Sequence, residues 1–149
     1  MDETNAASAI NAMHGGTFAG SIGVVIESAS GSGVVATVAI QSHHLQPQGI
    51  VHGGVHASIV ETVASVGAAL DALTHTRNVV GLENHTSFVR AVRGGVLRAT
   101  ATPITRGRRT QAWDVVIRNE AEETVATGRV RFLVLEEDAE VRGAKLATK

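Results

Sequence analysis

The stretch from Gly53 to Thr74 constrains the fold of this chain more than any other. It runs for about twenty residues without proline after a polar loop, Ser42 to Gln48, and its apolar side chains recur at helical spacing. These side chains cover most of the helix circumference, which is typical of a helix enclosed by other structure. Glu61 places a single charge in its middle. The stretch therefore predicts a long core helix.

The segments on both sides of this helix have strand character. The predicted strands are Phe18 to Ser30, Val34 to Gln41, Asn78 to Val92, Val96 to Ile104, Thr110 to Arg118 and Thr124 to Leu135. Short turns between successive strands favour antiparallel pairing. We therefore expect an α+β fold in which a curved antiparallel sheet of five to six strands wraps around one long central helix.

The chain has 149 residues, which is most economically one domain. Residues 1–16 lack periodicity and are expected to be a mobile lead-in or a short helix. Residues 17–136 are expected to form the single domain. Residues 137–149 are charged and are expected to be a partly disordered tail.

Composition excludes several classes of function. A formal net charge of -1 and a pI of about 6.6 argue against a nucleic-acid partner, which would require a clustered excess of basic residues. We expect no apolar run to approach the length of a membrane span, and we expect a cytoplasmic location. The chain has no cysteine, so thiol nucleophiles and thiolate metal sites are excluded. The histidine spacings match no zinc motif, and only His52 and His56 merit a metal analysis. No metal is expected.

The helix begins with the sequence Gly49-Ile50-Val51-His52-Gly53-Gly54, and Glu61 lies nine residues beyond the histidine. Gln46 precedes His52 by six residues, and Asn84-His85-Thr86-Ser87-Phe88 opens a later strand. Together these residues resemble the hotdog-fold acyl-CoA thioesterases, and most closely the Glu-using 4-hydroxybenzoyl-CoA thioesterases. The related phenylacetate-pathway thioesterases typically carry Asp at the position of Glu61. The resemblance covers Gly23 to Leu135 and implies the hotdog fold.

The resemblance also implies roles for single residues. Glu61 would attack the thioester carbonyl or activate water, and the Gly53 N–H would polarise that carbonyl. Gln46 would bond near the carbonyl, His52 would orient the turn, and Ser65 would stand where the family has a water-placing Thr. The residues expected to contact the substrate are Gly54, Arg90, Arg108 and Arg109. The arginines would lie near the coenzyme A phosphates, although the family often has small hydroxyl residues at the last two positions. His56 departs from the family pattern. Coenzyme A would be part of the substrate, and no other cofactor is implied.

Physical chemistry supports these roles without deciding them. Hydrolysis of a thioester needs stabilisation of a developing oxyanion and a base or nucleophile on the other side of the carbon. The N–H groups of Gly53 and Gly54 at a helix N-terminus suit the first need, and Glu61 suits the second. Each group also has a purely structural interpretation. The glycines would then only permit a sharp turn, and Glu61 would lie on an exposed polar stripe of the helix.

The spacing of the two groups bears on assembly. Gly53 and Glu61 are eight residues apart, or roughly 12 Å along a helix, but both must come within about 3 to 4 Å of one carbonyl. Two antiparallel helices of a two-fold dimer satisfy this better than one helix does. We expect a homodimer with composite sites, and from the family a dimer of dimers.

The leading hypothesis is an acyl-CoA thioesterase for an aromatic (hydroxybenzoyl-like or phenylacetyl-like) or medium-chain acyl group. A hydratase or dehydratase of acyl thioesters is disfavoured, because such enzymes usually pair His with Asp in the pocket. A non-catalytic acyl-CoA-binding regulatory module remains the alternative from another class.

Overall fold

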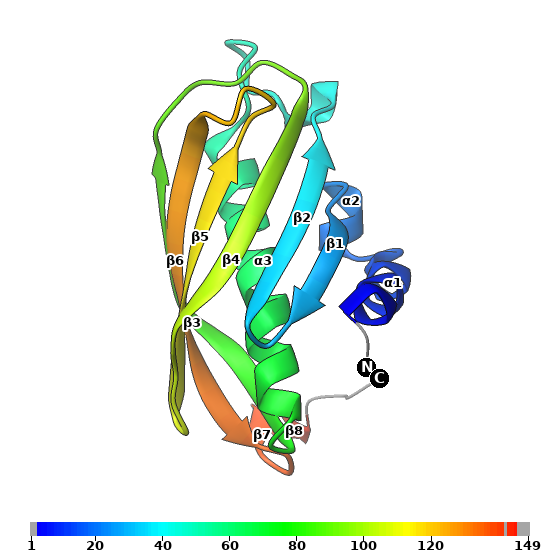
Figure 1. The fold of residues 1–149 in the computed structure, drawn as a ribbon, viewed down its shortest axis with the longest axis vertical. Helices are drawn as coiled ribbons and strands as arrows, with labels where there is room; N and C mark the ends of the chain where they lie inside the picture. The colour runs from blue at the N-terminus through cyan, green and yellow to red at the C-terminus, as the bar shows by residue number, and fades with distance from the viewer. Residues whose placement is uncertain (1–2, 142, 146–149) are drawn as a thin grey trace.

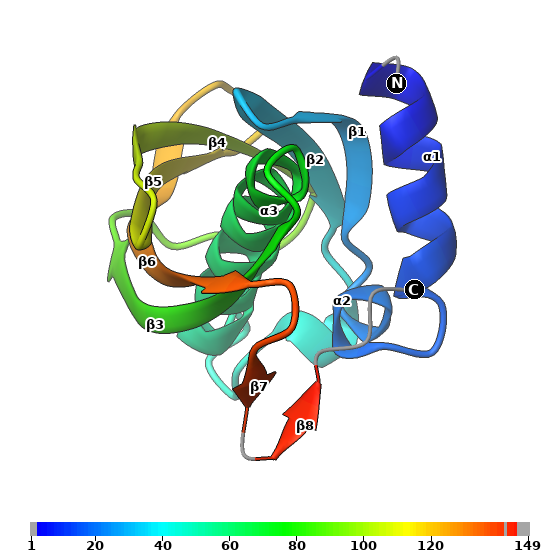
Figure 2. The same cartoon turned by 90° about the horizontal axis from the view of Figure 1, so that it is seen from below.

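Helix α3 (Gly53–Leu73) lies at the centre of a computed structural model that describes residues 3–141 and 143–145. A six-stranded antiparallel sheet in the order β1-β2-β4-β5-β6-β3 bends around it (Figures 1 and 2). Its strands are β1 (Val25–Ser30), β2 (Gly33–Ala39), β3 (Arg77–Phe88), β4 (Val96–Arg106), β5 (Thr110–Arg118) and β6 (Thr124–Glu136). The α+β hotdog architecture expected from the sequence is confirmed.

Smaller elements complete the chain: α1 (Glu3–His14), α2 (Phe18–Ser21), the 3-10 turn η1 (Ser42–His44), β7 (Glu140–Val141) and β8 (Ala144–Lys145). The first strand begins at Val25, not at Phe18, because Thr17 caps α2 by accepting the Gly20 N–H. Residues 142 and 146–149 of the predicted charged tail lie outside the described residues.

The alternation of the strands explains which face packs on α3. On β5 the side chains of Gln111, Trp113, Val115 and Ile117 are buried, whereas their neighbours are partly exposed. Trp113 reaches α3 at Gly67, where a Cβ would lie 2.5 Å from the indole ring. Small residues on the buried face of α3 thus allow the sheet to approach closely.

Helix α3 meets a length and composition test for a membrane span, contrary to the expectation that no run in this chain is long enough. In the fold it contacts all six strands of the large sheet. Its buried residues are His56, Ile59, Val60, Val63, Ala64, Gly67, Ala68 and Ala72. Helix α3 is therefore the core helix of a folded domain, where high hydropathy reflects burial against the sheet.

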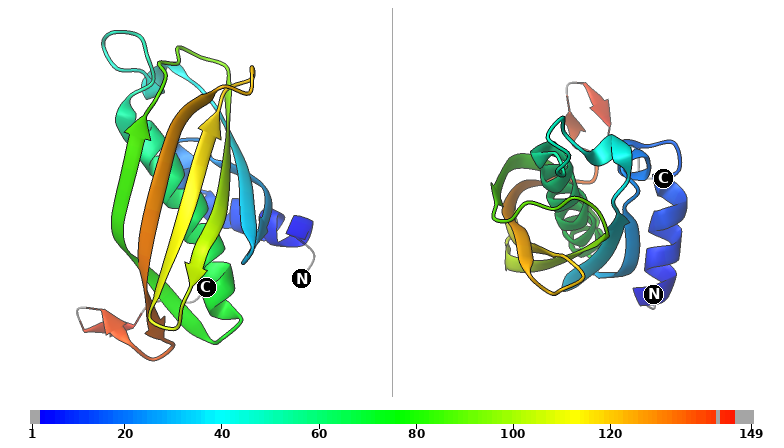
Figure 3. Two further views of the ribbon diagram at one scale, coloured as in Figure 1. Left: turned by 60° about the vertical axis from the view of Figure 1, so that its left-hand side comes forward. Right: turned by 90° about the horizontal axis from the view of Figure 1, so that it is seen from above.

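The two edges of the sheet differ. Helix α1 lies beside β1 (Figure 1), and the Asn11 side chain both donates to Ile26 O and accepts from Ile26 N at 2.8 Å, as a neighbouring strand would. Residues 3–14 form helix α1, so the short helix is the one of the two expectations for the lead-in that applies to them. The other edge, β3, is paired only with β6 among the described residues and lies at the margin of the sheet (Figure 3).

The contact between Gly67 and Trp113 gives a test of the core. Alanine at a helical glycine usually stabilises by about 1 kcal/mol, but the added methyl group would displace a buried indole, and overpacking costs about 1–3 kcal/mol. We expect Gly67→Ala to lower the free energy of unfolding in urea. Gly94→Ala is the matched control, because a Cβ there meets nothing within 4 Å. Stabilisation by Gly67→Ala would contradict this packing.

Candidate active site

The loop before α3 ends in a capped helix N-terminus. His52 has extended backbone angles, and its Nδ1 accepts the N–H of Gly54 at 2.8 Å. This bond ties His52 to the first turn of α3, and the orienting role that the resemblance implies for His52 stays a prediction. The first N–H groups of a helix have no partner within the helix, and His52 takes two of them, that of Gly54 at Nδ1 and that of Val55 at its backbone carbonyl oxygen, 2.9 Å away. The Gly53 N–H, at the positive end of the helix dipole, is the group left to polarise a ligand oxygen.

Gly53 is required for more than a sharp turn. A Cβ at this position would lie 2.7 Å from Cζ of Phe88, because the Phe88 ring packs directly over the backbone of the first helical turn. Phe88 is the last residue of β3, so this contact joins the helix N-terminus to the end of the edge strand. Glycine here permits a close approach that a side chain would prevent.

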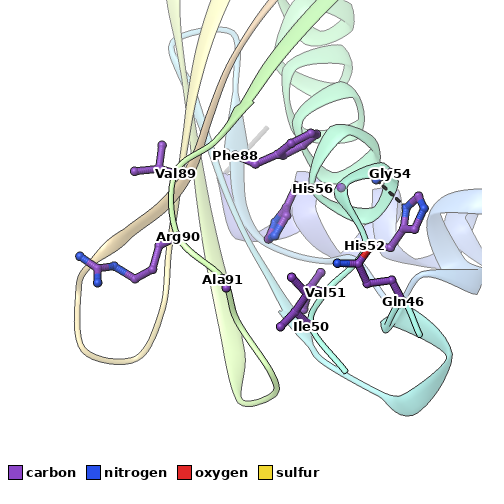
Figure 4. A pocket seen from close by; sticks show the side chains of 11 residues that line it. Gln46, Ile50, Val51, His52, Gly54, His56, Phe88, Val89, Arg90 and Ala91 are labelled. Carbon is purple, nitrogen blue, oxygen red and sulfur yellow. Dashed lines mark hydrogen bonds between the residues drawn. The ribbon is translucent and has the colours of Figure 1, made fainter. Parts of the chain in front are cut away.

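A pocket of about 480 Å³ opens beside this helix N-terminus. It is lined by Gln46, Ile50, Val51, His52, Gly53, Gly54, His56, Phe88, Val89, Arg90 and Ala91 (Figure 4). Its walls are the loop before α3 on one side and the segment that follows β3 on the other. Most of the lining is apolar, and the polar side chains are those of Gln46, His52, His56 and Arg90. Such a cavity suits a small organic group.

Two histidines near the pocket are buried and neutral. His56 is 3% exposed, its Nδ1 has no hydrogen-bond partner among the described residues, and burial lowers its pKa. His44 accepts the Gln41 N–H at Nδ1, while its Nε2 is buried without a partner in the described chain. Burial and the neighbouring His43 lower the pKa of His44. The described residues contain no group of three potential metal ligands, and His52 is engaged with Gly54.

Glu61 is held against the edge strand in the middle of α3. Its Oε2 accepts from Nδ2 of Asn84 at 3.0 Å, and the same amide donates to Ala57 O at 3.0 Å. Thr86 donates its hydroxyl to Oδ1 of Asn84 at 2.7 Å and thereby fixes the amide. Gly81 leaves room for the carboxylate, because a Cβ there would lie 2.8 Å from Oε1 of Glu61. The carboxylate is half-buried and has a defined orientation.

The residues singled out in the sequence fall into two groups within one chain. Gln46, His52, Gly53, Gly54 and Arg90 line the pocket. Glu61 is not among the lining residues, and its position in the helix places it about 12 Å further along the axis. Ser65 is half-buried one turn beyond Glu61, on the same helix face. The N–H of Gly54 is bonded to His52, and a contact of Gly54 with the substrate stays a prediction.

The arginines are also divided. Arg90 lines the pocket and forms an ion pair with Glu123 at 3.6 Å. Arg108 and Arg109 lie in the turn between β4 and β5, which Arg106 fixes at the other end of α3 by bonding Asp71 at 3.2 Å. Asp71 is 18 residues beyond Gly53, or about 27 Å along the helix. One chain therefore does not bring these two arginines to its own pocket.

Sequence reasoning assigned no role to Asn84, Thr86 or Gly81, and it left His56 without one. A signal for the first two was present, because Asn84, Thr86 and Phe88 alternate along β3 and so share one face of the strand. Their contact with Glu61 depends on how β3 lies against α3, which no local pattern specifies.

Known proteins share this architecture. A sequence model described as "Thioesterase superfamily" matches residues 48–126, which include all of α3 and every residue that lines the pocket except Gln46. The chain is 33% identical over 130 residues to the proofreading thioesterase EntH of Cronobacter sakazakii, spanning 85% of this chain and 92% of that protein. It is 31% identical over 127 residues to a 1,4-dihydroxy-2-naphthoyl-CoA hydrolase of Escherichia coli, spanning 85% and 93%. A crystal structure of a thioesterase from Haemophilus influenzae superposes with a TM-score of 0.82 at 30% identity, covering 87% of this chain and 90% of that one.

Proposed function

The chain belongs to the thioesterase superfamily and hydrolyses acyl-CoA thioesters; from this premise we propose that Glu61 is its catalytic carboxylate and that its substrate carries an aromatic or medium-chain acyl group. One observation supports the proposal above the others. Glu61 is the carboxylate on the central helix that the edge strand orients, through the 3.0 Å bond from Asn84. Such orientation is what a nucleophile or base requires.

The chemistry follows from the two groups on α3. The substrate carbonyl lies at the Gly53 N–H, where the helix dipole and the N–H stabilise the oxyanion. Attack by the Glu61 carboxylate forms an acyl anhydride and releases the coenzyme A thiolate, and water then hydrolyses the anhydride. In the alternative, Glu61 takes a proton from a water that attacks the carbonyl carbon, and it passes this proton to the departing thiolate, which leaves as the coenzyme A thiol. Gln46 bonds near the carbonyl, and Ser65 helps to place the water. Neither route uses a metal or a further cofactor.

The active site is shared between two subunits. Glu61 of one chain lies opposite Gly53 of the other when two α3 helices run antiparallel about a two-fold axis. The β3 edge supports this arrangement, because it is long and exposes Leu82 and Phe88, whereas α1 covers the β1 edge. Exposed strand edges of this kind pair with a second strand. The resulting homodimer has two sites, and its pairing into a dimer of dimers remains a prediction, as does a cytoplasmic location.

The same arrangement brings the arginines together. With Gly53 of one subunit opposite Glu61 of the other, the second subunit's α3 continues for about 15 Å to Asp71. The turn that carries Arg108 and Arg109 is fixed beside Asp71 by Arg106. An extended coenzyme A spans that distance. We assign Arg90 and this turn to the phosphates of the substrate, because guanidinium groups bind phosphate in a bidentate manner.

The acyl group is aromatic or of medium length. The pocket is mostly apolar and about 480 Å³ in volume, which accommodates either class. Two of the relatives described above have names that describe thioester hydrolysis, and one of them is a 1,4-dihydroxy-2-naphthoyl-CoA hydrolase. A hydratase pairs histidine with a carboxylate in the pocket, but the described residues that line this pocket include His56 and no Asp or Glu. A pure binding module would not need an oriented Glu61.

Glu61→Gln tests the catalytic assignment. The amide keeps the volume of the side chain but is neither a nucleophile nor a base, so we expect kcat to fall at least about 100-fold with little change in KM. Free-thiol release is measured on benzoyl-CoA, phenylacetyl-CoA and short, medium and long acyl-CoAs. Glu27→Gln is the matched control, since Glu27 pairs with Arg98 on β1 and β4, away from α3. Undiminished turnover by Glu61→Gln would refute this mechanism.

The arginine assignment predicts a different kinetic effect. Replacement of Arg108 and Arg109 by Ala should raise KM about ten-fold and leave kcat nearly unchanged, because nucleotide contacts act equally on the ground state and the transition state. Arg98→Ala serves as the control, because Glu27 holds that guanidinium on the sheet surface at 2.6 Å. A loss confined to kcat would show that the turn does not bind the nucleotide.

A further inference from the structure

We propose that His56 determines the specificity of the pocket by hydrogen-bonding a hydroxyl group on an aromatic acyl substrate. The inference rests on the proposed function and deepens it, because it names the residue that selects the acyl group and the chemical class selected.

The position of His56 points to such a role. It lies three residues after Gly53 in α3, and residues three apart share one helix face. Figure 4 shows its imidazole directed from the helix into the space between the segment after β3 and the loop before α3. A carbonyl bound at the Gly53 N–H therefore has His56 as a neighbour on the same side of the helix.

The imidazole has an unfulfilled bonding capacity. His56 is 3% exposed, and its Nδ1 is buried with no partner among the described residues. A buried polar atom without a partner destabilises a fold, and most such atoms in proteins are paired. An acyl group with a hydroxyl would satisfy the imidazole, whereas an unsubstituted group would leave it unpaired inside an apolar pocket.

The protonation state of His56 suits a hydroxyl. Burial lowers its pKa, so the ring is neutral at physiological pH and offers one N–H donor and one acceptor nitrogen. A hydroxyl group likewise both donates and accepts. A carboxylate substituent would need a charged imidazolium, which this burial disfavours.

The surroundings of the imidazole favour an aromatic ring. The Phe88 ring lies 6.1 Å from the His56 ring, centroid to centroid, at an interplanar angle of 36°. Ile50, Val51 and Ala91 complete an apolar wall, whereas Arg90 is exposed. The phosphates of coenzyme A belong at the exposed arginine, so the acyl group takes the buried end beside His56. Aromatic rings pack favourably in tilted arrangements of this kind.

The test compares matched substrates. The kcat/KM for 2-, 3- and 4-hydroxybenzoyl-CoA is divided by that for benzoyl-CoA, in the wild type and in His56→Leu. We expect the wild type to have a kcat/KM at least about ten-fold higher for one hydroxylated isomer than for benzoyl-CoA. In His56→Leu this ratio should fall to about one, because activity is lost on that isomer alone. His56→Gln, which retains hydrogen-bonding groups, should keep part of the preference. His75→Leu, in the turn after α3, is the matched control.

Two results would overturn the proposal. One is a wild type without preference for any hydroxylated isomer, or without activity on benzoyl substrates while it hydrolyses aliphatic ones. The other is an equal loss on benzoyl and hydroxybenzoyl substrates in a folded His56→Leu, which indicates a structural role or a contact with the pantetheine arm.

Failure of the proposed function is a separate outcome. If neither benzoyl nor aliphatic acyl-CoA is hydrolysed, the affinities of the stable thioethers phenacyl-CoA and 2-, 3- and 4-hydroxyphenacyl-CoA are measured by calorimetry. Tighter binding of one hydroxylated thioether to the wild type, lost in His56→Leu, would still support the role of His56. Equal binding of phenacyl-CoA and all three hydroxylated thioethers would overturn it.

Discussion

The curved sheet covers one side of α3. The other side, which carries Glu61 and Ser65, can pack against a second subunit. The covered side is closed by Trp113 against Gly67, where no side chain would fit. The other side carries Glu61, which the sheet reaches through its edge strand, where Asn84 bonds the carboxylate and Gly81 leaves room for it. The position of this edge strand therefore fixes both the catalytic carboxylate, through Asn84, and the first turn of α3, through Phe88 over Gly53.

The difference between the two sheet edges links assembly to chemistry. Asn11 of α1 satisfies the backbone of Ile26 on the β1 edge, so that edge is closed within the chain. The β3 edge holds Asn84 and Thr86 on the face toward α3 and remains available along its outer side. A dimer formed there buries the exposed edge and brings the carboxylate of one helix to the N-terminus of the other. The bond that orients Glu61 thus belongs to the strand through which we propose the subunits pair.

The sequence predicts the parts of this molecule that depend on local pattern. The apolar period from Gly53 onward gives α3, and His52 before two glycines gives its capped N-terminus, because both follow from contacts within a few residues. The bond between Glu61 and Asn84 spans 23 residues and depends on how a strand lies against a helix. The separation of Arg108 from the pocket arises likewise from the path of β4, which ends beside Asp71. Neither could be found without the fold.

Mixing two inactive variants tests the shared active site most directly. Gly53→Val blocks the carbonyl site by forcing the Phe88 ring away, and Glu61→Gln removes the carboxylate. In a hybrid dimer, one composite site combines the intact Gly53 of one chain with the intact Glu61 of the other. Refolding an equal mixture should restore about a quarter of wild-type thiol release, because half the dimers are hybrids with one intact site in two. Hybrid dimers that are verified by native mass spectrometry but remain inactive would contradict a site shared between subunits.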